Sequence, residues 1–277
     1  MIGATQIGRP PRQPGVVELG LVASLLLVAA GGWVLTGDRM AGMDAGPGTA
    51  LGGLGWFTVV WVTMMAAMML PSLAPVVVSR ARVQAGGRDR GATTPTGATT
   101  LFVAGYLITW AAAGLLAYAI VEGIRSLGLG FLAWDDAGPY VAGGVILAAA
   151  GYQLTRLKCT ALDHCRNPIA WLEQHWRPGR TGAVRMGIEH GRSCVGSSGG
   201  LMAALFALGV MSLGWMALVA ALIAAEKLLP SKTIAIRGIV VVLVALGIAV
   251  AVAPGDLPGL TIPGGSPMAG QSMEMAP

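Results

Sequence analysis

The sequence is poor in charge. Asp, Glu, Lys and Arg make up only 11% of its 277 residues, while 55% are hydrophobic, whereas about a quarter of the residues of a soluble domain are charged. Together with a mean hydropathy of +0.69, this composition places the chain among integral membrane proteins. The net charge of +5 needs no nucleic-acid partner, because arginines on cytoplasmic loops account for it. We expect the lipid bilayer, and no nucleic acid, as a partner.

The familiar signatures of nucleotide and hydrolase sites are also missing. The sequence has no P-loop, no G-x-S-x-G, no H-E-x-x-H and no dinucleotide fingerprint. An ATP-driven pump on this chain alone is therefore not expected, and no catalytic residue is predicted. A haem cofactor fits poorly, since no C-x-x-C-H is present.

Long apolar segments dominate the rest of the chain. A bilayer core requires about 20 apolar residues per helix, and this predicts an all-α, polytopic transmembrane helical bundle of about seven helices in a single domain, 16–253. The expected helices are 16–36, 55–78, 99–121, 138–157, 195–211, 213–229 and 234–253. We expect residues 1–15 to be a disordered cytoplasmic N-terminus and residues 254–277 a flexible, Met-containing extracytoplasmic tail.

The segment 195–229 could be one long helix, giving six in total, or a hairpin. With a hairpin near Ser212–Gly214, every Lys and Arg except Arg39 and Arg125 lies on one side. Basic residues favour the cytoplasmic side of a membrane. The charge pattern therefore favours a multi-pass protein of the bacterial inner (plasma) membrane, with a cytoplasmic N-terminus and an extracytoplasmic C-terminus.

The run WVTMMAAMMLPS, residues 61–72, is unusually rich in methionine. At 100° per residue, its methionines share one broad face of a helix and Ala66 and Ala67 take the opposite face; they are Met64, Met65, Met68 and Met69. Methionine commonly fills irregular gaps between helices, so this face could simply be packing. Thioethers also bind Cu(I), and Pro71 would interrupt the helical pattern and open a kink beside them.

The cysteines and histidines form a second group. All three of each lie in residues 159–194. His190 and Cys194 are four apart and share a helix face, and Cys165 lies on a segment that could meet them at the inner membrane face. With His164 or Cys159 they would give a site of three or four S and N ligands, suited to copper or, less well, to zinc. Buried cysteines and interfacial histidines are the alternative interpretation.

Other residues of these types carry weaker expectations. His175, between Trp171 and Trp176, is expected to be an interfacial anchor, with metal ligation as the lesser alternative. Glu189, next to His190, could support a metal ligand by a hydrogen bond, but a solvated charge is the favoured interpretation. Glu226 is expected to pair with an arginine of another helix. Methionines outside the membrane could capture copper or belong to uninformative tails; they are Met40, Met43, Met268, Met273 and Met275.

Several of these stretches together resemble an uncharacterised family of bacterial integral membrane proteins that are predicted to bind metal. The similar segments are W-x-x-M-x-x-A-M-M-x-P from Trp61 to Pro71, YQLT-x-LK at 152–158, CR-x-P at 165–168, GIEHG-x-x-C at 187–194, the residues Leu201, Met202, Phe206 and Gly209–Met211, and Glu226–Lys227. They span about residues 55–229. The chain departs from the family pattern at Ala161, where a cysteine is usual, and at Ser197–Gly199, where further cysteines and a tryptophan are usual. The resemblance thus implies a metal-binding membrane protein with fewer thiols.

These observations support three hypotheses. The first is a membrane protein that binds a soft transition metal, copper before zinc, and handles or delivers it across the inner membrane, with a metallochaperone or a membrane subunit as partner. The second is a non-catalytic subunit or assembly factor whose methionine face packs helices. The third is a metal- or haem-dependent membrane oxidoreductase.

Overall fold

The protein is all-helical wherever its structure is described. The computed structural model describes residues 15–40, 52–88, 97–128, 137–209 and 212–256, and these ranges contain nine α-helices, one short 3-10 helix and no strand. The predicted all-α bundle is therefore confirmed. The expected N-terminal segment and nearly all of the expected C-terminal tail fall outside these ranges.

Seven of the helices coincide with the apolar segments of the sequence, and two short ones, α5 and α6, lie between α4 and α7. Their bounds are α1 Val16–Met40, α2 Leu54–Arg88, α3 Ala98–Ser126, α4 Gly138–Gln153, α5 Arg156–Arg166, α6 Pro168–His175, α7 Gly179–Leu208, α8 Leu213–Leu228 and α9 Lys232–Val252, followed by the 3-10 helix η2 Pro254–Asp256.

Side-chain capping and a glycine with positive φ explain where several helices begin or end. The expected helix 138–157 stops at Gln153, and α5 begins anew because the Thr155 side chain accepts a hydrogen bond from the Lys158 amide, 3.3 Å. α7 stops before Gly209, whose φ of 105° favours glycine, and α8 starts after Ser212. The segment 195–229 therefore contains two separate helices.

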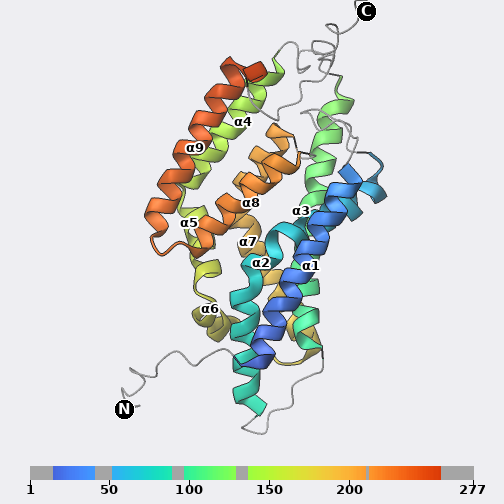
Figure 1. Cartoon of the computed structure of the whole chain (residues 1–277), viewed down its shortest axis with the longest axis vertical. Coiled ribbons are helices and arrows are strands. Elements are labelled where there is room, and N and C mark those ends of the chain that lie inside the picture. The colour runs from blue at the N-terminus through green and yellow to red at the C-terminus, as the bar shows by residue number, and fades with distance from the viewer. Residues whose placement is uncertain (1–14, 41–51, 89–96, 129–136, 210–211, 257–277) are drawn as a thin grey trace, which may run out of the picture.

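α2 does not end at Pro71. It continues through Pro71 and Pro75 to Arg88, as the expected helix 55–78 also runs through Pro71. A proline within a helix removes one backbone hydrogen bond and kinks the helix, and Figure 1 shows the two halves of α2 running in different directions.

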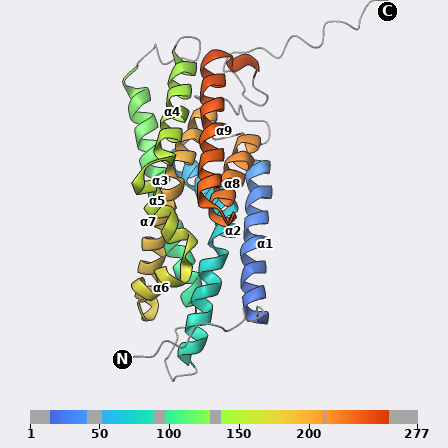
Figure 2. The same ribbon diagram turned by 90° about the vertical axis from the view of Figure 1, so that its left-hand side faces the viewer.

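The helices run alternately up and down the molecule. In Figure 1, α1 starts at the lower end, α9 finishes near the upper end, and α5 and α6 lie below α4 and α9. Figure 2 shows α4 and α9 side by side from a second direction, in agreement with their extensive packing. The other extensive pairs are α3 with α7 and α1 with α2.

Glycines bring α3 and α7 close together. A Cβ added at Gly105 of α3 would clash with the carbonyl oxygen of Val184, and one at Gly187 of α7 would clash with that of Phe102. Small residues permit this approach in membrane bundles. α7 is consequently held tightly against α3 at the level where its cysteine and histidine lie.

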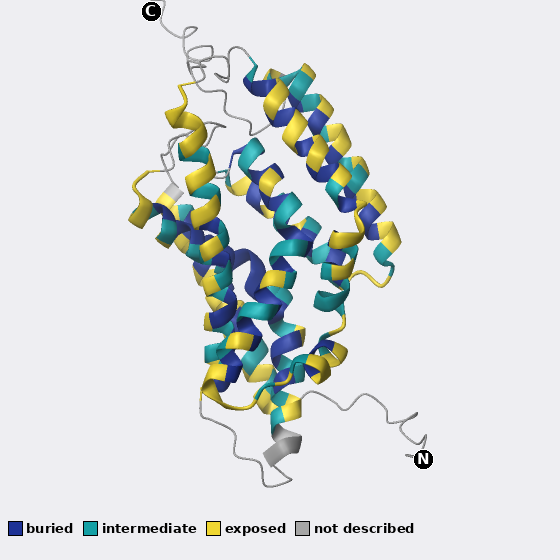
Figure 3. Cartoon of the chain, turned by 180° about the vertical axis from the view of Figure 1, so that it is seen from behind, coloured by how far each residue is buried: buried dark blue, intermediate teal, exposed yellow. Residues whose placement is uncertain are grey.

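Among the described residues, four helical segments are long and apolar enough to cross a membrane: Val16–Arg39, Leu54–Gln84, Ala98–Ser126 and Lys232–Val252. Their outward faces are apolar, since Leu27, Leu116 and Val241 are each more than half exposed. Figure 3 shows exposed residues along the outer sides of the bundle and buried residues facing inward. Such an apolar surface is suited to contact with lipid.

Candidate metal centre

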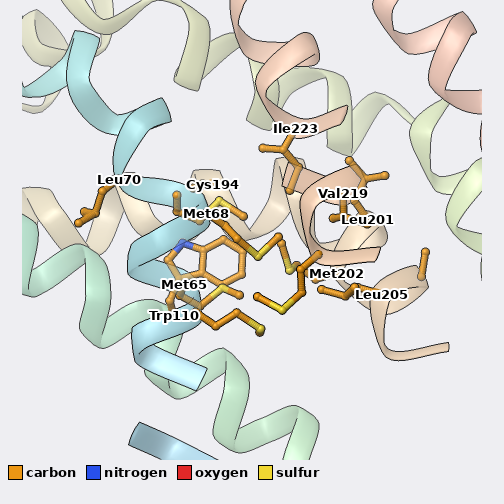
Figure 4. Close-up of a cluster of buried hydrophobic side chains, with 14 of the residues drawn as sticks. Met65, Met68, Leu70, Trp110, Cys194, Leu201, Met202, Leu205, Val219 and Ile223 are labelled. Atoms are coloured by element: carbon orange, nitrogen blue, oxygen red, sulfur yellow. The ribbon is translucent and has the colours of Figure 1, made fainter. Parts of the chain in front are cut away.

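The four methionines of α2 are buried in the middle of the bundle. Met64, Met65, Met68 and Met69 are between 0% and 5% exposed and belong to the main hydrophobic cluster. Figure 4 shows Met65 and Met68 beside the Trp110 indole, with Cys194 and Met202 of α7 close by. On the opposite side of α2, Ala67 packs against Gly32 of α1. The thioethers thus face α3 and α7.

Trp61 fixes the register of this methionine face. Its indole nitrogen donates a hydrogen bond to the carbonyl of Trp110, 2.8 Å, and its ring lies 5.4 Å from that of Phe206. The indole occupies the space that a side chain at Gly114 would need. α2 is therefore locked to α3 one turn before its first methionine.

Cys194 lies where four helices meet. Its sulfur is 3.1 Å from the Tyr106 hydroxyl of α3 and 3.0 Å from Nζ of Lys227 of α8. The same Nζ donates to the hydroxyl of Ser72, 3.2 Å, one turn beyond Met68 on α2. Because Cys194 is only 1% exposed, it is a thiol with a cationic partner inside the protein. Lys227 connects it to the end of the methionine face.

Cys165 approaches Cys194 from α5. Its sulfur is 3.7 Å from the hydroxyl of Ser197, which donates to the carbonyl of Cys194, 2.9 Å. A hydrogen bond with Cys194, followed by burial, raises the pKa of the Cys165 thiol well above its ordinary value. The two thiols therefore lie close enough to interact with each other.

Cys159 does not join this pair, because it lies on a different side of α5 from Cys165. It precedes Cys165 by six residues on the same helix, which corresponds to about 120° of rotation. Its side chain is half-buried. It therefore stands on another side of α5.

His190 is enclosed by aromatic rings. It is 3% exposed, and its ring centroid lies 6.1 Å from Phe102, 6.2 Å from Tyr106 and 4.9 Å from Trp171. Burial, and secondarily the positive charge of Lys227, lowers the pKa of His190 to about 3. His190 lies in the part of α7 that precedes the expected membrane-spanning segment 195–211. The imidazole is neutral, and its Nδ1 has no hydrogen-bond partner among the described residues.

Tyr106 links His190 to Cys194, since its ring faces the imidazole and its hydroxyl contacts the thiol. His164 is placed elsewhere: its ring lies 6.4 Å from His175. Within the described part of the chain, no group of three or more His, Cys, Asp or Glu side chains stands close enough to hold a metal ion. The structure thus brings Cys165 to Cys194, but among the described residues it does not gather the other expected Cys and His ligands with them into one site.

Two surroundings differ from a simple exposed position. Trp171 is buried, 2% exposed, and stacks on His175 at 4.8 Å, so it packs inside the protein, and the interfacial role of His175 stays a prediction. Glu189 is not simply solvated, because it pairs with Arg177 at 3.1 Å and Arg185 at 3.4 Å.

Glu226 has a different partner from the one expected. It pairs with Lys158 at 2.6 Å, and the two side chains are 1% and 0% exposed. An arginine of another helix, Arg166, does lie nearby, but it donates to the backbone carbonyls of Glu226, Leu229 and Pro230. The buried pair and this cap fix α5 against the end of α8, and so place Cys165 opposite Lys227.

Three residues of the centre were not expected from the sequence. Lys227 and Met202 lie in segments that resemble the metal-binding family, but neither was expected to belong to the site. Tyr106 lies in an apolar run, and Met202 is two turns beyond Cys194. A polar or charged residue at the edge of an apolar helix is a signal for a functional contact. The outer methionines cannot be compared, because the side chain of Met40 and the whole of Met43, Met268, Met273 and Met275 lie outside the described part.

The comparisons with known proteins give one family. The family model described as PpoB2, a copper chaperone, matches residues 58–250, a range that contains the methionine face, both thiols and Lys227. No curated protein and no solved structure matches the chain. The match agrees with the metal-related family that the sequence resembles, and it supports a role connected with copper.

Proposed function

The chain belongs to the PpoB2 copper-chaperone family, and from this premise we propose that it is an integral membrane protein that binds Cu(I) and hands it on. Cys165 and Cys194 hold the ion at the inner end of the bundle, and the methionines of α2 receive it. The residues fit this cargo, because thiolates and thioethers are soft ligands that favour Cu(I) over Zn(II), Mg(II) or Ca(II).

The observation that carries the proposal is the double contact of Lys227. Its Nζ binds the Cys194 sulfur and the Ser72 hydroxyl, and so joins the thiol pair to the helix that carries Met64, Met65, Met68 and Met69. Met202 extends the same set of soft donors along α7 (Figure 4). A Cu(I) ion that leaves the thiols therefore meets thioethers next, without crossing a purely hydrocarbon region.

Lys227 and Tyr106 prepare the thiol pair for the ion. The thiolate is the form of cysteine that binds metals, and a nearby positive charge stabilises it. The Tyr106 hydroxyl gives a further polar contact on the other side of the sulfur. These groups let a charged sulfur exist in a buried position.

The methionines also favour a second candidate. Their near-complete burial equally suits a helix-packing face in a membrane assembly factor. The two functions differ in whether the purified protein binds copper.

The test is the copper content of the detergent-purified protein after anaerobic loading with Cu(I). We expect the double variant Cys165→Ser/Cys194→Ser to bind one ion fewer per chain than the unaltered protein. Cys159→Ser, which changes a thiol on another side of α5, is the matched control and should retain the full content. Metal analysis by mass spectrometry gives the number directly.

Two results would contradict the proposal. Full copper binding by the double variant would remove the thiols from the site, and Met65→Leu/Met68→Leu would then show whether the thioethers hold the ion instead. An unaltered protein that binds no Cu(I) would leave helix packing as the account of the methionine face.

A further inference from the structure

The structure places two histidines together next to the thiol site. His164 and His175 lie on α5 and α6, with ring centroids 6.4 Å apart and planes at 65°. Both side chains are half-buried, so they are partly accessible from outside the protein. We propose that this pair is a second metal site, which takes Cu(I) as a two-coordinate ion between the imidazoles. The inference rests on the proposed copper function.

The separation of the rings suits one ion between them. Imidazole nitrogens bind metals at about 2.0 Å, so two such bonds and the radii of the two rings place the centroids roughly 6 Å apart when the ion is bound in line. Imidazole is a common ligand of copper. Zn(II) would need further ligands, and the described residues supply no third His, Cys, Asp or Glu here.

A hydrogen bond leaves a metal-binding nitrogen free on His175. Its Nδ1 lies 2.9 Å from the carbonyl oxygen of Trp171. A carbonyl oxygen only accepts, so in the neutral ring Nδ1 carries the proton and Nε2 keeps its lone pair. Metal-binding histidines characteristically have their second nitrogen fixed in this way.

The surrounding structure favours a cation between the rings. His164 is in the last turn of α5 and His175 is in the last turn of α6, and the C-terminal end of a helix carries partial negative charge. The neighbouring cation Arg166 is occupied with the backbone carbonyls at the end of α8. Trp171 stacks flat on His175, at 9°, and restricts the orientation of its ring.

The position of the pair suggests its role in the pathway. His164 immediately precedes Cys165 on α5, and Trp171 contacts both His175 and His190. An ion held by His164 and His175 would thus lie next to Cys165 along α5. The Trp171 ring alone would separate it from His190 on α7. The pair is placed to accept Cu(I) at the surface before the buried thiols take it.

The experiment separates the histidine site from the thiol site by replacing all three cysteines. The variant Cys159→Ser/Cys165→Ser/Cys194→Ser should retain one Cu(I) per chain under anaerobic loading. X-ray absorption at the copper edge should show nitrogen neighbours in a two-coordinate arrangement. Adding His164→Gln and His175→Gln should abolish that ion. Gln174→Ala, at an exposed position of α6, is the matched control and should leave it in place.

The outcomes distinguish the two proposals. A cysteine-free variant without copper, in a protein that otherwise binds one ion, overturns the histidine site and leaves the thiol site standing. Sulfur neighbours in the absorption spectrum assign the remaining ion to methionines and also overturn it. If the cysteine-free variant binds as much copper as the unaltered protein and the histidine changes remove it, the thiol site fails and the histidine site stands.

Discussion

At the scale of single residues, we expect the charge of Lys227 to influence how readily Cys194 binds a metal. The ammonium lies 3.0 Å from the sulfur within the bundle, where opposite charges a few ångströms apart attract by about 4 kcal/mol at an effective dielectric constant of 20. Part of that attraction is lost to desolvation. We therefore expect Lys227→Met to weaken Cu(I) binding at pH 7 by roughly tenfold, about 1.4 kcal/mol.

Competition with a chromophoric Cu(I) chelator measures this change. Lys227→Arg keeps the positive charge and should bind within a few-fold of the unaltered protein. Equal affinities for Lys227→Met and Lys227→Arg would show that the charge has no part in binding.

At the residue scale, some contacts of the candidate site could be predicted from the sequence and others could not. The expected meeting of Cys165 and Cys194 follows from two polar segments that end on the same side, and the structure has it. Lys158, Lys227 and Glu226 could not be assigned in this way, because their partners are set by how α5 packs beneath α8. Spacing along one helix gives a shared face, whereas a contact between helices depends on tertiary packing.

At the scale of the helices, the helices expected from the sequence agree best with the structure where hydrophobicity alone is enough to predict a helix. The long apolar runs became helices, but the start of α7 and the two short helices α5 and α6 carry many polar residues and escaped a criterion based on length and hydropathy. The methionine face and its opposite alanine face could be predicted from the helical period. That Ala67 meets Gly32 of α1 could not, since any apolar neighbour would satisfy the same pattern.

The contact of α3 with α7 gives a prediction at this scale. A Cβ at Gly187 would collide with the carbonyl of Phe102, and backbone cannot move aside as a flexible side chain can. We expect Gly187→Ala to push the helices apart and to destabilise the protein by about 1–3 kcal/mol, as overpacking typically does. The thermal unfolding midpoint in detergent should fall by several degrees.

Gly123→Ala is the control for that experiment. It lies on α3 with nothing within 4 Å of an added Cβ, and alanine is the better helix former, so its midpoint should be unchanged or slightly raised. If Gly187→Ala unfolds at the same temperature as the unaltered protein, the close contact between α3 and α7 is wrong.

At the scale of the whole molecule, the distribution of charge gives an orientation in the membrane. Arg39 and Arg125, the basic residues that the charge pattern assigns to the outside, are in the last turns of α1 and α3, which end toward the upper part of Figure 1. The opposite end carries the polar start of α7 together with α5 and α6. By the preference of basic residues for the cytoplasmic side, we expect the thiol and histidine sites to face the cytoplasm.

Single cysteines in a background without the three native ones test this orientation. Ser126→Cys stands at the end of α3 and Gln174→Cys on α6, and both positions are exposed. In intact spheroplasts a maleimide that cannot cross the membrane should label Ser126→Cys, and it should label Gln174→Cys only after lysis. The reverse pattern would place the thiol and histidine sites outside, and copper would then enter from the opposite side. Labelling of both in intact cells would contradict a bundle that spans the membrane between these two positions.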